Sequence, residues 1–182
     1  MDTAQIESRE DRWLTAIHEA GHAVVAHLLG LVPCQLVVHG PEADRAGTCH
    51  TQDHSARGTG ARDLGDLVDV ALAGLVAEMI ATGREAWDED SRDLGRAVGL
   101  LMGHVEDCDA VIRELDRSRR RVRRLLEEHW WVVERLAGAL EVLGRLGRGE
   151  ILEILEGAPE AAGCGGTVRC TVTGAAGRGK GT

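Results

Sequence analysis

Residues 10–29 combine an apolar helical repeat with polar side chains, and this combination limits the possible folds more than any other feature. The helical period predicts one buried face, and Gly30 is a suitable residue to end the helix. His18, Glu19 and His22 lie inside the same stretch. Polar side chains need partners where they are buried, so we expect a polar site inside the fold. The residues that recur at steps of three and four are Trp13, Ile17, Ala20, Val24 and Leu28.

The segment His18-Glu19-Ala20-Gly21-His22 has the pattern HExxH. Residues four apart on a helix lie on one face, so both imidazoles can bind one Zn²⁺ ion at about 2.0–2.1 Å. Glu19 follows the first histidine, where its carboxylate can take a proton from a water that zinc has activated. The pattern therefore predicts a hydrolytic zinc site with Glu19 as the general base.

A catalytic zinc site needs a third protein ligand and an open fourth position. A metzincin would have glycine at position 25 and histidine at position 28, but the chain has Val25 and Leu28, which excludes that class. Two later carboxylates remain candidates for the third ligand. Glu78 lies within the apolar run 75–80, where burial would require a partner. Asp93 lies in the first turn of a predicted helix, where the helix dipole also favours an acid.

The remaining patterns predict a mainly α-helical fold with a small β-hairpin in the N-terminal third. Residues 35–39 and 47–51 are short β-like runs, and the turn residues 40–44 between them favour an antiparallel hairpin. A loop is expected at 53–60. Further helical patterns occur at 61–82, 91–103 with Ser91 as a candidate N-cap, 107–128, 129–145 and 149–156.

The length of 182 residues fits one domain with short tails. We expect a polar segment at 1–9, a folded domain at 10–156 and a tail at 157–182. The tail contains eight glycines and has no helical period, so we expect it to be disordered. The five cysteines form no CxxC pair, which indicates free thiols rather than a disulfide framework.

Composition and charge narrow the functional classes. The net charge is −9, which argues against nucleic-acid binding through the whole surface. Six arginines lie within 117–124, but acidic residues at helical spacing favour an ion-paired, solvated face. The N-terminus is polar and acidic, and no apolar run reaches the roughly 18–20 residues that cross a bilayer. We therefore expect a cytoplasmic protein without a membrane segment or a nucleic-acid partner.

Three ordered segments resemble the FtsH-type zinc metalloproteases. HEAGHAVVA at 18–26 is similar to the HEAGHALVA signature of that family. AGLVAEMI at 73–80 is similar to its GGRAAEE-type helix, and SRDLGRA at 91–97 is similar to its NDLxxAT segment. The resemblance covers roughly residues 10–156.

The resemblance implies one zinc ion per chain, with His18, His22 and Asp93 as ligands and Glu19 as the general base. For Glu78 it implies a hydrogen bond that orients a ligand imidazole. The strand at 47–51 resembles the family's substrate-binding edge, where an extended peptide can pair through its backbone. The residues of this strand are Gly47, Thr48, Cys49, His50 and Thr51.

The function implied by the resemblance is a zinc metalloendopeptidase that hydrolyses peptide bonds of unfolded or flexible polypeptides. The family couples its peptidase to an ATPase module, but this sequence has no GxxxxGK[ST] loop. We therefore expect the domain to work with a separate ATPase or as a homo-oligomer. The alternative is a zinc-containing peptide-binding or regulatory module of the same fold without turnover, and the intact Glu19 argues against it.

The group that stabilises the oxyanion is left open by the sequence. Some zinc peptidases use a tyrosine, but this chain contains none. Zinc itself, His50 or His54, an arginine or a backbone N–H can serve instead.

Overall fold

A computed structural model describes residues 3–40, 43, 46–52, 64–84, 91–105 and 107–157. The loop expected at 53–60, most of the turn at 40–44 and the tail after Gly157 lie outside these ranges. The helices are α1 (Thr3–Leu28), α2 (Leu64–Thr82), α3 (Arg92–Met102), α4 (Cys108–Glu128), α5 (Trp130–Leu143) and α6 (Arg148–Glu156). The strands are β1 (Val32–Val38), β2 (Gly47–Gln52) and β3 (Arg145–Gly147).

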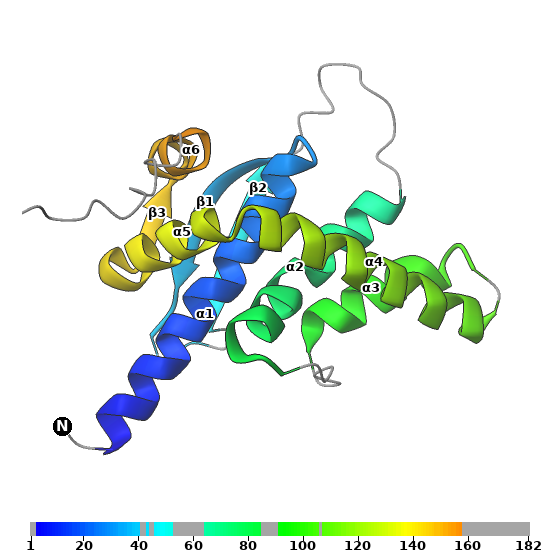
Figure 1. The fold of residues 1–182 in the computed structure, drawn as a ribbon, viewed down its shortest axis with the longest axis horizontal. Coiled ribbons are helices and arrows are strands. Elements are labelled where there is room, and N and C mark those ends of the chain that lie inside the picture. The colour runs from blue at the N-terminus through cyan, green and yellow to red at the C-terminus, as the bar shows by residue number, and fades with distance from the viewer. Residues whose placement is uncertain are drawn as a thin grey trace, which may run out of the picture.

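The fold is mainly α-helical with a small antiparallel sheet (Figure 1), which confirms the predicted fold class. The predicted hairpin forms between β1 and β2, where Leu36 pairs with Cys49. On its other side Leu36 pairs with Leu146 of β3, so the strand order is β2-β1-β3. β2 is consequently an edge strand within the described part of the chain.

Several boundaries differ from the prediction. β1 spans Val32–Val38 rather than residues 35–39. α1 begins at Thr3 rather than at residue 10. The sequence did not predict this extension, because residues 3–9 have no apolar period that could indicate a helix. The pattern predicts a helix over 129–145, but α5 ends at Leu143, since Gly144 adopts a left-handed conformation with φ 73°. The chain then enters β3, whose three residues are too few to show an alternating pattern.

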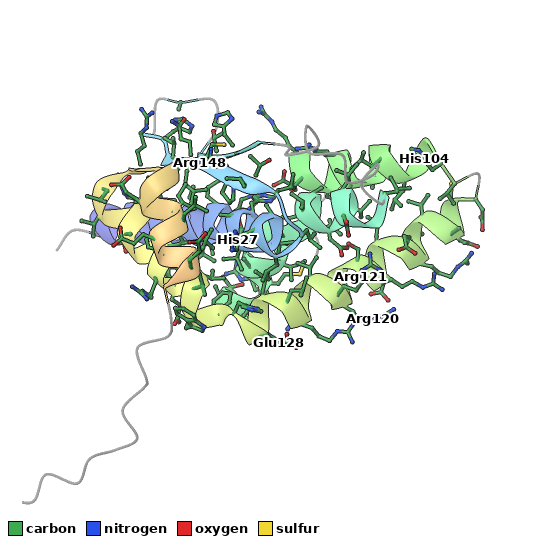
Figure 2. All side chains as sticks on the ribbon, turned by 90° about the horizontal axis from the view of Figure 1, so that it is seen from above. His27, His104, Arg120, Arg121, Glu128 and Arg148 are labelled. Atoms are coloured by element: carbon green, nitrogen blue, oxygen red, sulfur yellow. The ribbon has the colours of Figure 1, made fainter. Side chains whose placement is uncertain are left out.

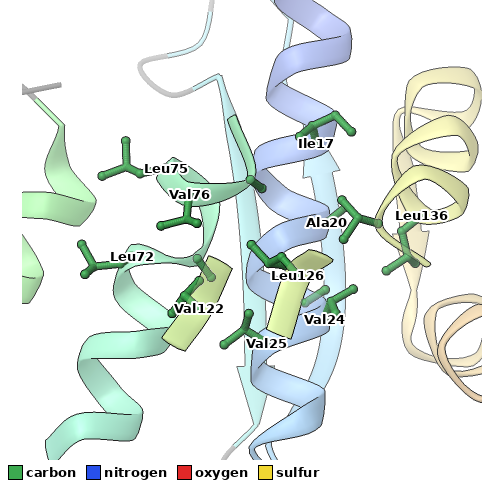
Figure 3. Close-up of a cluster of buried hydrophobic side chains, with 14 of the residues drawn as sticks. Ile17, Ala20, Val24, Val25, Leu72, Leu75, Val76, Val122, Leu126 and Leu136 are labelled. Atoms are coloured by element: carbon green, nitrogen blue, oxygen red, sulfur yellow. The ribbon is translucent and has the colours of Figure 1, made fainter. Parts of the chain in front are cut away.

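α1 occupies the centre of the hydrophobic core, between α2 and α5 (Figure 3). The apolar faces of these helices are buried against one another, and each large aliphatic side chain contributes about 1.5–3 kcal/mol by burial. This packing fixes the position of the histidine-bearing turns of α1. The side chains labelled in Figure 3 are Ile17, Ala20, Val24 and Val25 of α1, Leu72, Leu75 and Val76 of α2, Val122 and Leu126 of α4, and Leu136 of α5.

The crossing of α1 and α2 is close because small residues meet there. A Cβ atom on Gly21 would lie 2.6 Å from the Ala77 Cβ and 2.9 Å from the Ala73 carbonyl oxygen. Glycine at position 21 therefore lets the two helix backbones approach. The close approach brings the face of α1 that carries His18 and His22 against α2.

α4 is held on α2 by a polar cluster. The buried carboxylate of Asp69 accepts a hydrogen bond from Ser118 and two from Arg121, at 2.8 and 3.0 Å. Arg120, the residue before Arg121 on α4, pairs with Asp116 on its own helix. Figure 2 shows Arg120 and Arg121 on α4. These pairs agree with the interpretation of this arginine run as an ion-paired face.

Candidate metal centre

Three side chains from two helices bring one ligand atom each to a common point. His18 Nε2 lies 3.1 Å from His22 Nε2. Asp93 Oδ2 lies 2.8 Å from the first of these nitrogens and 3.2 Å from the second. Among the residues that the structure describes, this is the one group of three or more that could hold a metal ion. We call His18, His22 and Asp93 the three-ligand cluster.

A further hydrogen bond fixes the orientation of each imidazole. His18 Nδ1–H donates to Glu78 Oε1 at 2.7 Å, and His22 Nδ1–H donates to the Val70 carbonyl oxygen at 2.8 Å. With these acceptors, the neutral form of each ring carries its proton on Nδ1 and a lone pair on Nε2, which is the form that can bind a metal ion. Glu78 thus lies behind His18 and outside the three-ligand cluster.

The donor set of the three-ligand cluster fits a zinc ion. Three lone pairs that face one another are unfavourable unless a proton or a metal cation lies among them. Atoms bound to one tetrahedral Zn²⁺ at 2.0–2.1 Å are about 3.3 Å apart, and the three separations in the cluster are 2.8–3.2 Å. Two imidazoles and one carboxylate are ligands that zinc accepts, and they leave a fourth position open.

The electrostatics of the cluster favour a positive charge at its centre. Burial lowers the pKa of His18, but hydrogen bonds to Asp93 and Glu78 outweigh burial and raise it to about 10. Burial raises the pKa of Asp93, but the hydrogen bonds with His18 and His22 outweigh this effect and hold it well below its usual range. A divalent cation bound among these groups would supply the charge that they stabilise.

The start of α3 places Asp93 at the cluster. Ser91 Oγ accepts hydrogen bonds from the backbone N–H groups of Asp93, at 3.2 Å, and Leu94, at 3.5 Å. The predicted N-cap at Ser91 is therefore confirmed. The cap starts the helix immediately before Asp93, so the acid lies in the first turn, where the helix dipole favours it.

Glu19 lies beside the cluster and is only 5% exposed. Its carboxylate accepts no hydrogen bond within the described ranges and lines the cleft that contains the cluster. Burial raises the pKa of Glu19, whereas the neighbouring imidazoles of His22 and His18 lower it. A buried carboxylate with a raised pKa that lines this cleft is suited to accept a proton.

The cleft has a volume of about 730 Å³, and β2 and α3 both contribute to its walls. Four of the five residues of the predicted edge strand line it, whereas His50 is exposed and does not. His54, the other candidate histidine for the oxyanion, lies outside the described residues. The lining residues of β2 that the sequence singles out are Gly47, Thr48, Cys49 and Thr51.

Two glycines shape the site in a way that the sequence analysis misses. A Cβ on Gly74 of α2 would overlap the His18 imidazole, and a Cβ on Gly47 of β2 would overlap Glu19 Oε1. The sequence analysis names Gly47 only as a residue of the edge strand. It includes Gly74 only within the segment 73–80 that resembles the GGRAAEE-type helix. The available signal is that glycine inside a helix costs about 1 kcal/mol relative to alanine, which indicates a packing requirement.

Comparison with known proteins adds no family to these observations. No protein-family model matches the sequence, and no curated protein matches it at a significant level. None of the described helices is both long and apolar enough to cross a bilayer.

Proposed function

We propose that this chain is a zinc-dependent metalloendopeptidase, similar to the proteolytic domain of FtsH-type proteases, that cleaves unfolded or flexible polypeptides. The observation that carries the proposal is the convergence of the three-ligand cluster beside the buried carboxylate of Glu19. Such a set provides ligands for one zinc ion and a base within the same cleft.

The chemistry follows from the positions of these groups. When bound by the three-ligand cluster, Zn²⁺ supplies Lewis acidity that polarises the scissile carbonyl and lowers the pKa of water. Glu19, buried beside the cluster, would accept the proton that the attacking water loses. The Glu19 carboxyl group then donates this proton to the amide nitrogen as the C–N bond breaks.

The position of β2 supports a polypeptide substrate. β2 lies at the sheet edge within the described residues and lines the cleft that holds Glu19. An extended peptide can add to such an edge through backbone hydrogen bonds, which require no particular side chains. This mode of binding favours unfolded chains, so folded substrates would require a separate ATPase to unfold them.

The proposal is tested by cleavage of a labelled, permanently unfolded protein by the zinc-loaded chain without ATP. The Glu19→Gln variant serves as the matched control, because it keeps the shape of the side chain and removes the base. We expect the wild type to cleave and the variant to be slower by about 10²–10⁴-fold. Both proteins should contain one zinc ion per chain by elemental analysis.

Absence of cleavage by the wild type at full zinc occupancy would contradict the peptidase function. Peptide binding that survives in Glu19→Gln would then favour the alternative of a peptide-binding module. Degradation of a stably folded protein by the purified chain would refute the requirement for a separate ATPase.

A further inference from the structure

Two arginines of α3 line the cleft that contains the three-ligand cluster. Arg92 and Arg96 are four residues apart, so they lie on one face of the helix, and both line the cleft. Arg92 is adjacent in sequence to Asp93. Any substrate carbonyl that reaches the cluster therefore lies within a cleft that these two arginines also line.

Neither guanidinium group has an acidic partner within the described part of the chain. This differs from the arginine run of α4, where Arg117 pairs with Glu114 at 3.3 Å and Arg121 pairs with Asp69 at 2.8 Å. Arg92 and Arg96 are exposed, and no described residue occupies their guanidinium donors. The protein has a net charge of −9, so two arginines in a cleft without a described acidic partner are not explained by an excess of basic residues.

These arginines change the sign of the net charge that the described residues and a bound divalent cation give the cleft. Its described acidic side chains are Glu19, Glu78 and Asp93. A divalent cation alone would leave the lining with one excess negative charge, which repels a carboxylate. With Arg92 and Arg96 included, the described part of the lining carries one excess positive charge, which attracts a carboxylate.

We propose that Arg92 and Arg96 select polypeptide substrates that carry a carboxylate near the cleaved bond, supplied by an aspartate or glutamate side chain. This inference rests on the proposed function, because it assigns a substrate class to the same cleft. Guanidinium groups bind carboxylates through paired N–H donors, which fixes the orientation of the ligand as well as its charge. The backbone pairing at β2 holds any extended chain, and the arginines add a preference for an acidic one.

The test uses short unfolded peptides in which a single glutamate occupies successive positions of a neutral sequence. Each peptide has a glutamine counterpart, and each is made with an amidated and with a free C-terminus. Binding to the zinc-loaded Glu19→Gln variant is measured by fluorescence anisotropy, and cleavage is measured with the wild type. The ratio of glutamate to glutamine peptide is the quantity compared in every case.

We expect the glutamate peptide to bind about fivefold more tightly at its best position, because two partly exposed ion pairs contribute modestly. Combining Arg92→Gln with Arg96→Gln should bring the ratio close to one, and raising the ionic strength should reduce it. The matched control combines Arg113→Gln with Arg117→Gln, two arginines at the same spacing on α4 that line a different groove. The control should keep the wild-type ratio.

A ratio of one in the wild-type arginine background, or an unchanged ratio after the α3 substitutions, would overturn the inference. A preference confined to peptides with a free C-terminus would overturn the assignment to a side chain, because the α-carboxylate would be the ligand. Cleavage without a preference for glutamate over glutamine peptides would support the peptidase function and refute the role of the arginines. A preference for glutamate peptides in binding, without any cleavage by the wild type, would support the role of the arginines and refute the peptidase function.

Discussion

At the scale of single residues, the site depends on what lies behind each ligand as much as on the ligands. His18 Nδ1 donates a hydrogen bond to Glu78, and His22 Nδ1 donates one to the Val70 carbonyl oxygen. These two hydrogen bonds set the direction in which both Nε2 atoms point. Gly74 completes this arrangement, because the absence of a side chain leaves space for the His18 ring. A ligand held from two sides loses little freedom when it binds an ion.

The substitution Gly74→Ala should therefore weaken zinc binding. The added methyl group overlaps the His18 imidazole, so the ring must turn away from the cluster. Disturbing the orientation of a ligand typically costs about 10–100-fold in metal affinity, and we expect a loss in this range. A competition titration with a fluorescent zinc chelator measures it.

Gly138→Ala is the matched control for Gly74→Ala. Gly138 is also inside a helix, but a Cβ there meets no atom within 4 Å. This substitution should leave zinc affinity unchanged and stabilise the fold by about 0.5–1 kcal/mol, since alanine favours the helix over glycine. Equal zinc affinity in the Gly74 and Gly138 variants would show that the space beside His18 is not required.

The predictability of the site also differs from residue to residue. His18 and His22 were predictable because the i, i+4 spacing places both on one face of a single helix. The residues alone left Glu78 and Asp93 as alternatives, because the choice depends on how α2 and α3 pack against α1. Gly74 could not be assigned to His18, since the two residues approach only through the tertiary fold.

At the scale of elements, the helices with a clear apolar period or a side-chain cap were the predictable part. α3 and α4 begin where Ser91 and Asp107 cap them, and their starts lie within one residue of the predictions. β3 was missed because three residues carry no period, and its pairing with β1 is a long-range contact. The early start of α1 at Thr3 was missed because a polar helical turn resembles a polar loop in sequence.

The cap of α3 has a consequence for the site, because it fixes the turn that carries Asp93. Ser91→Ala removes an acceptor for two backbone N–H groups and should lower the free energy of unfolding by about 1 kcal/mol. The same substitution should weaken zinc binding, because the first turn of α3 loses its fixed position. Urea denaturation and a zinc titration measure the two effects.

The cap of α4 provides the comparison for Ser91→Ala. Asp107 accepts a hydrogen bond from the Asp109 N–H at 3.1 Å, and Asp107 is not among the residues that line the cleft. Asp107→Ala should cost a similar amount of stability without a change in zinc affinity. Weaker zinc binding in both variants would indicate that global stability, rather than the start of α3, controls the metal site.

At the scale of the whole molecule, zinc would join elements that are far apart in sequence. His18 and His22 come from α1, Asp93 comes from α3, and the bond from His18 to Glu78 extends the connection to α2. Ligand binding to the folded state alone stabilises it, by about 2.7 kcal/mol at a free concentration one hundred times the dissociation constant. Chelation of zinc should therefore lower the melting temperature of the chain.

The loss of stability on chelation should also be uneven. Amide hydrogen exchange should accelerate most in the first turn of α3 and in α1 around His18, because these segments lose a shared ligand. α5 and α6 contain no residue of the cluster and should change least. The variant that combines His18→Ala with His22→Ala is the control, and zinc should not raise its melting temperature. An equal zinc-dependent rise in the melting temperature of that variant would show that the stabilising ion binds elsewhere than at the three-ligand cluster.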